Sequence, residues 1–290
     1  MENYISRLSQ DLIKTNLEHY WPGFEMVAYA LYDRSHVYLI NHPKFSWEQK
    51  TLKWDEQFTG CTLILYENYP TAIVNLELFE GYERMFSILA HELFHGYQFL
   101  KSEKRFPNEI LGITYPLSKE NIDLRNYERF NLYHALLEKD PKKKQRYLSS
   151  FFSHREERAA QINEYISYEN LIETVEGPAW YVEFKAFLEK SPLEYDAVLK
   201  KYGQSLINQY ESTSRIRMSC YSSGLFTCLL LDEFSPDWKL DFLDIDDSLY
   251  NFFKKTAGNI KTESQHHVEV SLDTDAAINF ALEERKNEFK

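Results

Sequence analysis

Hydrophobic and polar positions follow two different spacings along this chain, and the change falls near Gly81. Before Gly81, residues 4–18 place Ile5, Leu8, Leu12 and Ile13 at helical intervals, which predicts one short amphipathic helix. Four short runs that follow are rich in β-branched and aromatic residues and are separated by Pro, Gly, Asn and Asp. These runs predict strands at residues 26–31, 37–40, 62–66 and 71–78.

After Gly81 the spacing is helical almost to the end of the chain. The predicted helices are 82–101, 120–139, 143–175, 179–190, 194–211, 220–232 and 273–289. Phe106-Pro107-Asn108 is the best candidate for a boundary between lobes, and Asp140-Pro141 interrupts the helical region. The pattern therefore predicts an α+β protein, with an α/β lobe at residues 1–105 and a helical lobe at 106–290.

The composition is that of a folded, acidic protein. Of the 290 residues, 43% are hydrophobic, and the formal net charge is -12. This charge repels phosphate backbones, so we expect no nucleic-acid partner. Neither a signal peptide nor a membrane-spanning stretch is recognisable, which favours the cytoplasm and no membrane. Cys61, Cys220 and Cys228 are three widely spaced residues, which predicts reduced thiols and no disulfide framework.

The segment His91-Glu92-Leu93-Phe94-His95 carries the clearest chemistry. Positions i and i+4 of a helix lie almost one above the other, so His91 and His95 can bind one tetrahedral zinc ion. Glu92 points about 100° away from His91 around the helix, beside the metal. A carboxylate at that place can act as general base toward a water molecule that attacks a carbonyl. Chance occurrence of the five residues is the alternative, and the helical pattern around them argues against it.

A catalytic zinc site needs a third protein ligand. The extended motif with a third histidine is excluded, because residue 98 is Gln and residue 101 is Lys. None of the other histidines stands at a spacing that indicates a third ligand. The other histidines are His19, His36, His42, His134, His154, His266 and His267.

The segment from Glu173 to Glu183, E-T-V-E-G-P-A-W-Y-V-E, resembles the E-G-x-A-x-Y-x-E segment of gluzincins. Gluzincins are the thermolysin-like superfamily that includes the leukotriene-hydrolase/aminopeptidase branch. The resemblance implies a thermolysin-like fold with the active-site helix between its lobes, and it implies Glu176 as the third zinc ligand. Glu173 and Glu183 share a helical face with Glu176 and could orient the ligands. A helix with exposed acids is the alternative.

Three features of the same region need a structural account. Gly177-Pro178 predicts a sharp turn just before a helix begins. Trp180 stands four residues after Glu176, where thermolysin-like enzymes often have an acid. His95 and Glu176 are 81 positions apart, which implies an inserted helical hairpin at residues 121–170. The insertion carries acids and bases at helical spacing, and we expect most of them on a solvated face. They are Arg125, Glu128, Arg129, Arg155, Glu156, Arg158 and Glu169.

Two further segments resemble the aminopeptidase branch. Residues 220–225, C-Y-S-S-G-L, are similar to its Y-x-x-G element, which implies that Tyr221 stabilises the oxyanion. A packing role for Tyr221 is equally open, and Arg215 and Arg217 are alternative electrophiles. Residues 71–75, T-A-I-V-N, stand where that branch has G-A-M-E-N, with Val74 in place of the glutamate that grips the substrate amine. The strand could still add a peptide at the sheet edge, and loss of the amine anchor favours endopeptidase activity.

Together these features predict a zinc metallopeptidase that acts on peptides or unfolded segments. Two other interpretations stay open: a non-catalytic metal-binding module that keeps a peptidase fold, and a metal-dependent hydrolase of a non-peptide substrate. Glu92 argues against the first of these, because a purely structural zinc site has no use for a general base.

Overall fold

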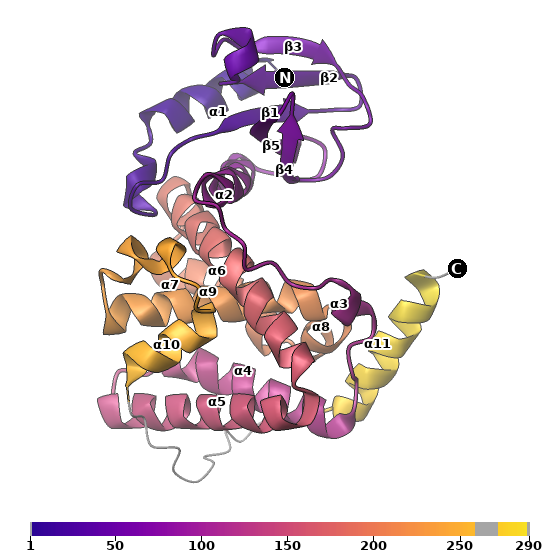
Figure 1. Ribbon diagram of the computed structural model, residues 1–290, viewed down its shortest axis with the longest axis vertical. Coiled ribbons are helices and arrows are strands. Elements are labelled where there is room, and N and C mark those ends of the chain that lie inside the picture. The colour runs from indigo at the N-terminus through magenta and orange to yellow at the C-terminus, as the bar shows by residue number, and fades with distance from the viewer. Residues whose placement is uncertain (1, 259–271, 289–290) are drawn as a thin grey trace. The chain divides into compact units, whose positions relative to one another are not determined.

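The computed structural model describes residues 2–258 and 272–288 and shows an α+β chain. A five-stranded mixed sheet near the N-terminus is followed by a mostly helical region (Figure 1). The chain forms two compact units. The first, the sheet unit, contains residues 1–104, 181–198 and 239–245, and the second, the helical unit, contains 105–180, 199–238 and 246–290. The chain thus leaves the sheet unit close to the expected boundary at residue 105 and returns to it twice.

Five strands make up the sheet, in the spatial order β3-β2-β1-β5-β4. Their bounds are β1 Ala28–Tyr32, β2 His36–Ile40, β3 Lys50–Lys53, β4 Thr62–Tyr66 and β5 Tyr69–Asn75. β1 and β5 run parallel, with Tyr29 opposite Ala72, and the other three pairs are antiparallel. β3 was not predicted, because its alternating lysines resemble a polar loop more than a strand.

β5 is an inner strand of the sheet. It pairs with β1 on one side and with β4 on the other, and Ala72, Ile73 and Val74 are fully buried. The expectation that residues 71–75 add a peptide at a sheet edge is therefore wrong. A strand whose two edges are already paired has no free N–H and C=O groups to offer. The strand that forms this edge of the sheet is β4.

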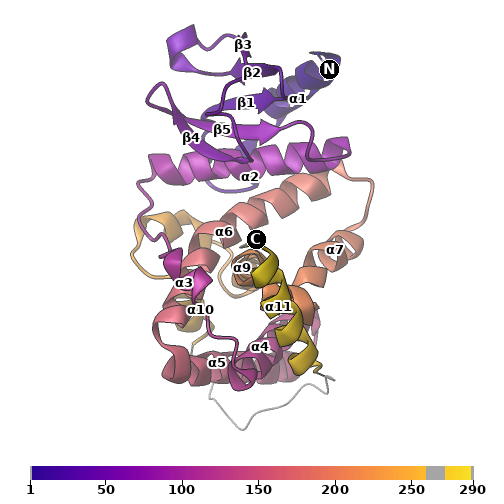
Figure 2. The same ribbon diagram turned by 90° about the vertical axis from the view of Figure 1, so that its right-hand side faces the viewer.

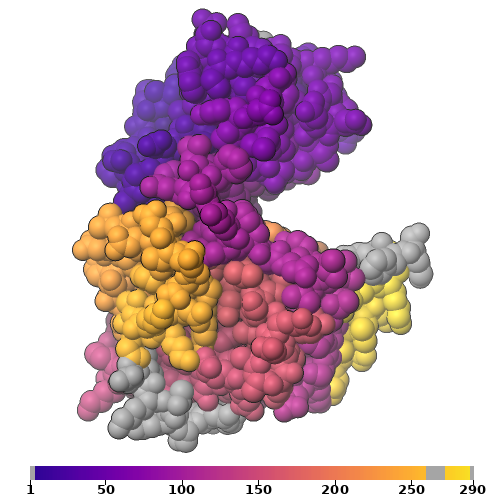
Figure 3. Space-filling model, in the orientation of Figure 1, coloured from indigo at the N-terminus to yellow at the C-terminus, as the bar shows by residue number. Residues whose placement is uncertain are grey.

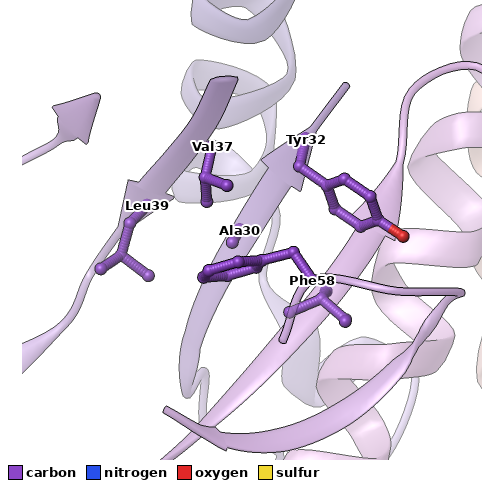
Figure 4. Close-up of a cluster of buried hydrophobic side chains, with 6 residues drawn as sticks. Ala30, Tyr32, Val37, Leu39 and Phe58 are labelled. Carbon is purple, nitrogen blue, oxygen red and sulfur yellow. The ribbon is translucent and has the colours of Figure 1, made fainter. Parts of the chain in front are cut away.

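Each face of the sheet has its own hydrophobic packing. One face carries a cluster that contains Ala30, Tyr32, Val37, Leu39 and Phe58, with Ile73 as its sixth buried member (Figure 4). Side chains alternate along a strand, so Ala72 and Val74 point to the opposite face. Helix α2 (Tyr82–Leu100) packs on β5. The cluster contains no residue of α2, so this helix covers the opposite face of the sheet (Figure 2).

The rest of the sheet unit completes its core. In helix α1 (Glu2–Lys14), Ile5, Leu8 and Leu12 are buried as their spacing predicts, whereas Ile13 is exposed. The space-filling view shows the N-terminal residues of this unit, in indigo and purple, as closely packed atoms (Figure 3). Four short 3₁₀ helices are also present in the described residues: Leu17–His19, Pro43–Phe45, Trp238–Leu240 and Phe242–Asp244.

The helical unit is built around a hairpin of α4 and α5. The other helices that belong to it wholly or in part are α3 Ile110–Ile113, α6 Glu164–Lys190, α7 Tyr195–Ile207, α8 Gln209–Ser214, α9 Ile216–Phe234, α10 Leu249–Ala257 and α11 Thr274–Glu288. Ser118 is the N-cap of α4 (Lys119–Leu137), and Asp140 is the N-cap of α5 (Pro141–Ile162). The Asp140 side chain accepts a hydrogen bond from the Lys143 N–H. Asp140-Pro141 is thus an N-cap followed by proline at the first helical position.

Helix α6 runs without interruption through Gly177-Pro178. The predicted sharp turn there is wrong, and the break between helices falls instead at Asn163, whose φ is 21°. Gly177 has a packing role: a Cβ atom built on it would lie 2.8 Å from the Cα of Gly224 in α9. A Cβ built on Gly224 would lie 2.6 Å from the Cα of Gly177. The two glycines therefore allow the backbones of α6 and α9 to touch, since any other side chain would force the helices apart.

The charged residues of the α4–α5 hairpin are buried, contrary to expectation. Of the seven acids and bases considered, Glu156 is exposed and the other six are buried. Arg155 and Arg158 both bind Glu128, and Arg158 and Arg125 both bind Glu169. Spacing along one helix suggested a solvated face because it cannot show that acids on α4 and α6 meet bases on α4 and α5. Buried charges persist only when paired in this way.

Among the described residues, no helix combines the length and the apolar composition that a membrane crossing requires.

Candidate metal centre

Helix α2 presents His91 and His95 side by side on one of its faces. The opposite face is apolar, and its Phe86, Leu89 and Leu93 are fully buried, which fixes the rotation of the helix. The Nε2 atoms of the two histidines lie 3.0 Å apart, with their rings inclined at 77°. Two imidazoles on one tetrahedral zinc ion place their nitrogens roughly 3.3 Å apart. The pair is therefore within a few tenths of an ångström of metal-binding geometry.

The other nitrogen of each ring faces an oxygen acceptor. His95 Nδ1 lies 2.8 Å from the Gln98 amide oxygen, and His91 Nδ1 lies 3.1 Å from a carboxylate oxygen of Glu183. The hydrogen bond to Gln98 favours the His95 tautomer with its proton on Nδ1, which leaves a lone pair on its Nε2, whereas the approach of Glu183 to His91 is an electrostatic contact without hydrogen-bond geometry. The two Nε2 atoms lie within hydrogen-bond distance of each other, and when neither carries a proton both can bind one cation. This donor arrangement fits a metal ion.

Glu183 is held in turn by Arg84. The Arg84 guanidinium donates to Glu183, whose side chain is fully buried in the C-terminal half of α6. We expected Glu183 to orient a ligand, and it contacts His91. We did not expect Arg84, although it stands seven residues before His91, two helical turns away on the same face of α2. Arg84, Glu183 and His91 thus form a chain of charge contacts behind the metal-facing nitrogen.

Glu92 follows His91 on α2 and is 7% exposed. Its charge acts on Cys61, which directly precedes β4. Burial raises the pKa of the Cys61 thiol to about 11; the Asn75 N–H opposes this, and the charge of Glu92 adds to it. Cys61 is therefore a neutral thiol at neutral pH, as expected for a free cysteine. Its place beside Glu92 was not predicted, because only the sheet brings residues 61 and 92 together.

Glu176 stands on α6 seven residues before Glu183, so both acids share one helical face. One carboxylate oxygen of Glu176 and one ring nitrogen each of His91 and His95 form a group of possible metal ligands whose atoms lie within 4.8 Å of one another. The donor set of two imidazoles and one carboxylate is the type that catalytic zinc prefers.

In the helical unit, Glu176 is paired with Arg217 of α9. Arg217 Nη2 lies 3.0 Å from Glu176 Oε1, its Nη1 donates to the Tyr221 hydroxyl, and its Nε lies 3.1 Å from Glu109 Oε1. Burial lowers the pKa of Arg217, but Tyr221, Glu176 and Glu109 outweigh it and raise that pKa. Two arginines were considered as electrophiles. Arg217 contacts Glu176, whereas Arg215 is exposed at the junction of α8 and α9.

Tyr221 lies next to Glu176 on the same side of α9 as Arg217. Burial raises the pKa of its hydroxyl, and the charge of Glu176 raises it further. The hydroxyl therefore keeps its proton at neutral pH and can donate a hydrogen bond. The Tyr221 ring makes an edge contact with the Trp180 ring, at an interplanar angle of 87°, and this contact holds the Tyr221 ring in place.

Glu173 binds other residues of the helical unit. Its carboxylate accepts hydrogen bonds from Arg155, at 2.9 and 3.0 Å, and from the Ser223 hydroxyl at 2.5 Å. Glu173 thus ties α6 to α5 and α9, and its expected role in orienting a ligand stays a prediction. His266 and His267 lie outside the described residues.

Comparisons with known protein families, curated proteins and solved structures give no match for this chain.

Proposed function

We propose that this protein is a zinc-dependent hydrolase of peptide bonds, of the gluzincin type. His91, His95 and Glu176 would hold the ion. The observation that carries the proposal is the pair of imidazoles whose Nε2 atoms lie 3.0 Å apart, with the His95 Nδ1 hydrogen-bonded to Gln98 and the His91 Nδ1 3.1 Å from a Glu183 carboxylate oxygen. One metal ion bound by both Nε2 atoms would account for that arrangement.

Zinc in such a site supplies Lewis-acid polarisation of an oxygen atom and a nucleophilic water at neutral pH. The chain's own residues account for the other steps. Glu92, next to His91 in sequence, takes a proton during attack on the carbonyl carbon and returns it to the leaving nitrogen. Tyr221 and Arg217 offer hydrogen-bond donors beside Glu176, where negative charge would develop on the carbonyl oxygen.

Two features favour cleavage within a peptide over trimming from its N-terminus. Val74 is fully buried and carries no charge, so β5 has no group to grip a free amine. β4 has one unpaired edge, to which an extended peptide can add as a further strand. The substrate would therefore be aligned by main-chain hydrogen bonds, with no need for a free amine.

The metal itself is tested by direct measurement. Purified protein is expected to carry close to one zinc ion per chain, measured by elemental analysis after extensive dialysis. His91→Ala, His95→Ala and Glu176→Ala should each lose most of that zinc, because two remaining ligands bind a catalytic ion weakly. His134→Ala is the matched control and should keep its zinc. Full occupancy in the three ligand variants would rule out this ligand set.

Glu183 gives a second, graded test. Glu183→Gln keeps the shape of the side chain but removes the charge that faces His91 Nδ1. We expect zinc affinity to fall about 10- to 100-fold while the helical content stays the same. Competition with a chromophoric chelator measures the affinity, and Glu164→Gln, at the exposed start of α6, is the control. An unchanged zinc affinity would show that Glu183 does not support the ligand.

The two other interpretations differ from the proposal in what they predict for activity. A non-catalytic module would bind zinc and cleave nothing. A hydrolase of non-peptide substrates would lose activity on its own substrate in Glu92→Gln but would not cleave a broad peptide library.

A further inference from the structure

A groove in the helical unit concentrates positive charge on an otherwise acidic protein. It has a volume of about 530 Å³ and lies where α3, the start of α9 and the end of α11 meet. Arg215, Arg217 and Arg285 line it, and among the described lining residues Glu109 is the one acid. The chain as a whole has a net charge of -12, so three arginines around one acid stand out.

The three guanidiniums are engaged to different degrees. Arg217 is bound to Glu109, Glu176 and Tyr221. Arg285 donates to the backbone oxygen of Tyr115 at 3.3 and 3.4 Å, which are long hydrogen bonds. The Arg215 side chain is exposed, and within the described ranges no residue pairs with it. At least one guanidinium is therefore ready to bind an anion without breaking an existing ion pair.

The contact of Glu109 with Arg217 shows which anion the groove accommodates. Arg217 Nε lies 3.1 Å from one carboxylate oxygen of Glu109 and 3.3 Å from the other. Guanidinium and carboxylate match in shape, which makes arginine the preferred partner of carboxylates. Glu109 occupies the groove as an internal carboxylate, and its own side chain is 55% exposed, so a ligand can replace it at little cost.

Arg217 also connects the groove to Glu176, which it contacts at 3.0 Å. A group bound beside Arg215 and Arg285 is thus one side chain away from the candidate ligand and from Tyr221. Polyanions are an unsuitable match, because the net charge of -12 on the chain repels them. A single carboxylate avoids that repulsion.

We propose that this groove binds a carboxylate group of the peptide substrate, and that Glu109 competes for the same place. This inference rests on the proposed function, since it names the class of substrate that the same site takes. Two sources share this chemistry: the C-terminal carboxylate of a peptide and the side chain of an acidic residue.

Three N-acetylated peptides with one common sequence test the proposal. The first ends in a free carboxylate, the second carries one glutamate and an amidated end, and the third carries glutamine and an amidated end. Fluorescence anisotropy of labelled peptides measures binding to the wild-type protein. We expect at least one carboxylate peptide to bind about 10-fold more tightly than the neutral one, because charge-assisted hydrogen bonds are stronger than neutral ones. The peptide that shows the preference identifies the source.

Point variants then locate the site. Arg215→Gln should remove most of the preference, and Arg146→Gln, which deletes the same charge from an exposed position on α5, should preserve it. Glu109→Gln should increase the affinity for the carboxylate peptide, because the internal competitor is gone. Equal binding of all three peptides to wild type, or equal effects of Arg215→Gln and Arg146→Gln, would overturn the proposal.

Hydrolysis of the same peptides separates this inference from the proposed function. If all three are cleaved without a charge preference in binding, the groove assignment fails and the hydrolase proposal stands. If carboxylate peptides bind preferentially and none is cleaved, the groove assignment stands and the hydrolase proposal fails.

Discussion

Glu92→Gln is expected to lower peptide hydrolysis by about 10²–10⁴-fold without loss of zinc. The substitution keeps the size of the side chain and removes its ability to accept a proton. Because Glu92 is 7% exposed and adjoins a ligand without being one, metal content and fold should be unchanged. The assay uses N-acetylated peptides, so activity of the wild type on them also tests the expectation of internal cleavage.

The control is Glu83→Gln on the same helix, nine residues earlier in the first turn of α2. It removes an equal charge away from the histidines, so its rate should stay close to that of wild type. If Glu92→Gln retains wild-type activity, Glu92 is not the general base. If wild type and Glu92→Gln are equally inactive over a broad peptide library, the non-catalytic interpretation replaces the proposal.

Glu128→Gln should destabilise the protein by about 3–5 kcal/mol, the typical cost of removing one partner of a buried ion pair. Glu128 accepts hydrogen bonds from Arg155 at 2.5 and 2.8 Å and from Arg158 at 2.6 Å, and all three side chains are buried. The neutral amide would leave two buried guanidiniums with less compensating charge. Urea unfolding at neutral pH measures the free energy of unfolding.

Glu156→Gln is the matched control, because Glu156 is an exposed acid on α5 that pairs with Lys254. Exposed pairs contribute little, so we expect a loss below about 1 kcal/mol. If Glu128→Gln is no more harmful than Glu156→Gln, the buried network does not stabilise the helical unit.

The same network predicts how stability depends on pH. Burial by itself would raise the pKa of Glu128 and Glu169, but the neighbouring arginines outweigh it and hold both pKa values below the ordinary 4.5. A carboxyl whose pKa is lower in the folded than in the unfolded state stabilises the fold above its unfolded pKa. That contribution is lost as pH falls below about 4.5, and Glu128→Gln should show a shallower loss than wild type.

Local periodicity was sufficient to predict much of the secondary structure and the placement of His91 and His95 side by side on one helix. Helix α2 follows from the spacing of Phe86, Leu89 and Leu93, and the same spacing places His91 and His95 on its other face. β4 was predicted with its observed bounds, residues 62–66. These features depend on neighbours within a few positions, which a sequence displays directly.

Contacts between distant segments could not be read in this way. The contact of Glu183 with His91 joins positions 92 residues apart. The position of β5 between β1 and β4 depends on which strands pair in the sheet. Gly177 suggested a turn because glycine commonly ends helices, whereas here its missing side chain makes room for Gly224.

The buried charges of the helical unit show most clearly the difference between what local sequence determines and what contacts between distant segments determine. The sequence determined where acids and bases stand on each helix, and that spacing is the same for a solvated face and for a buried network. Only tertiary structure decided that Arg155 meets Glu128 and Glu173, because each pair comes from different helices. Burying a charge is favourable only with an opposite charge beside it, and that partner is defined by packing in space.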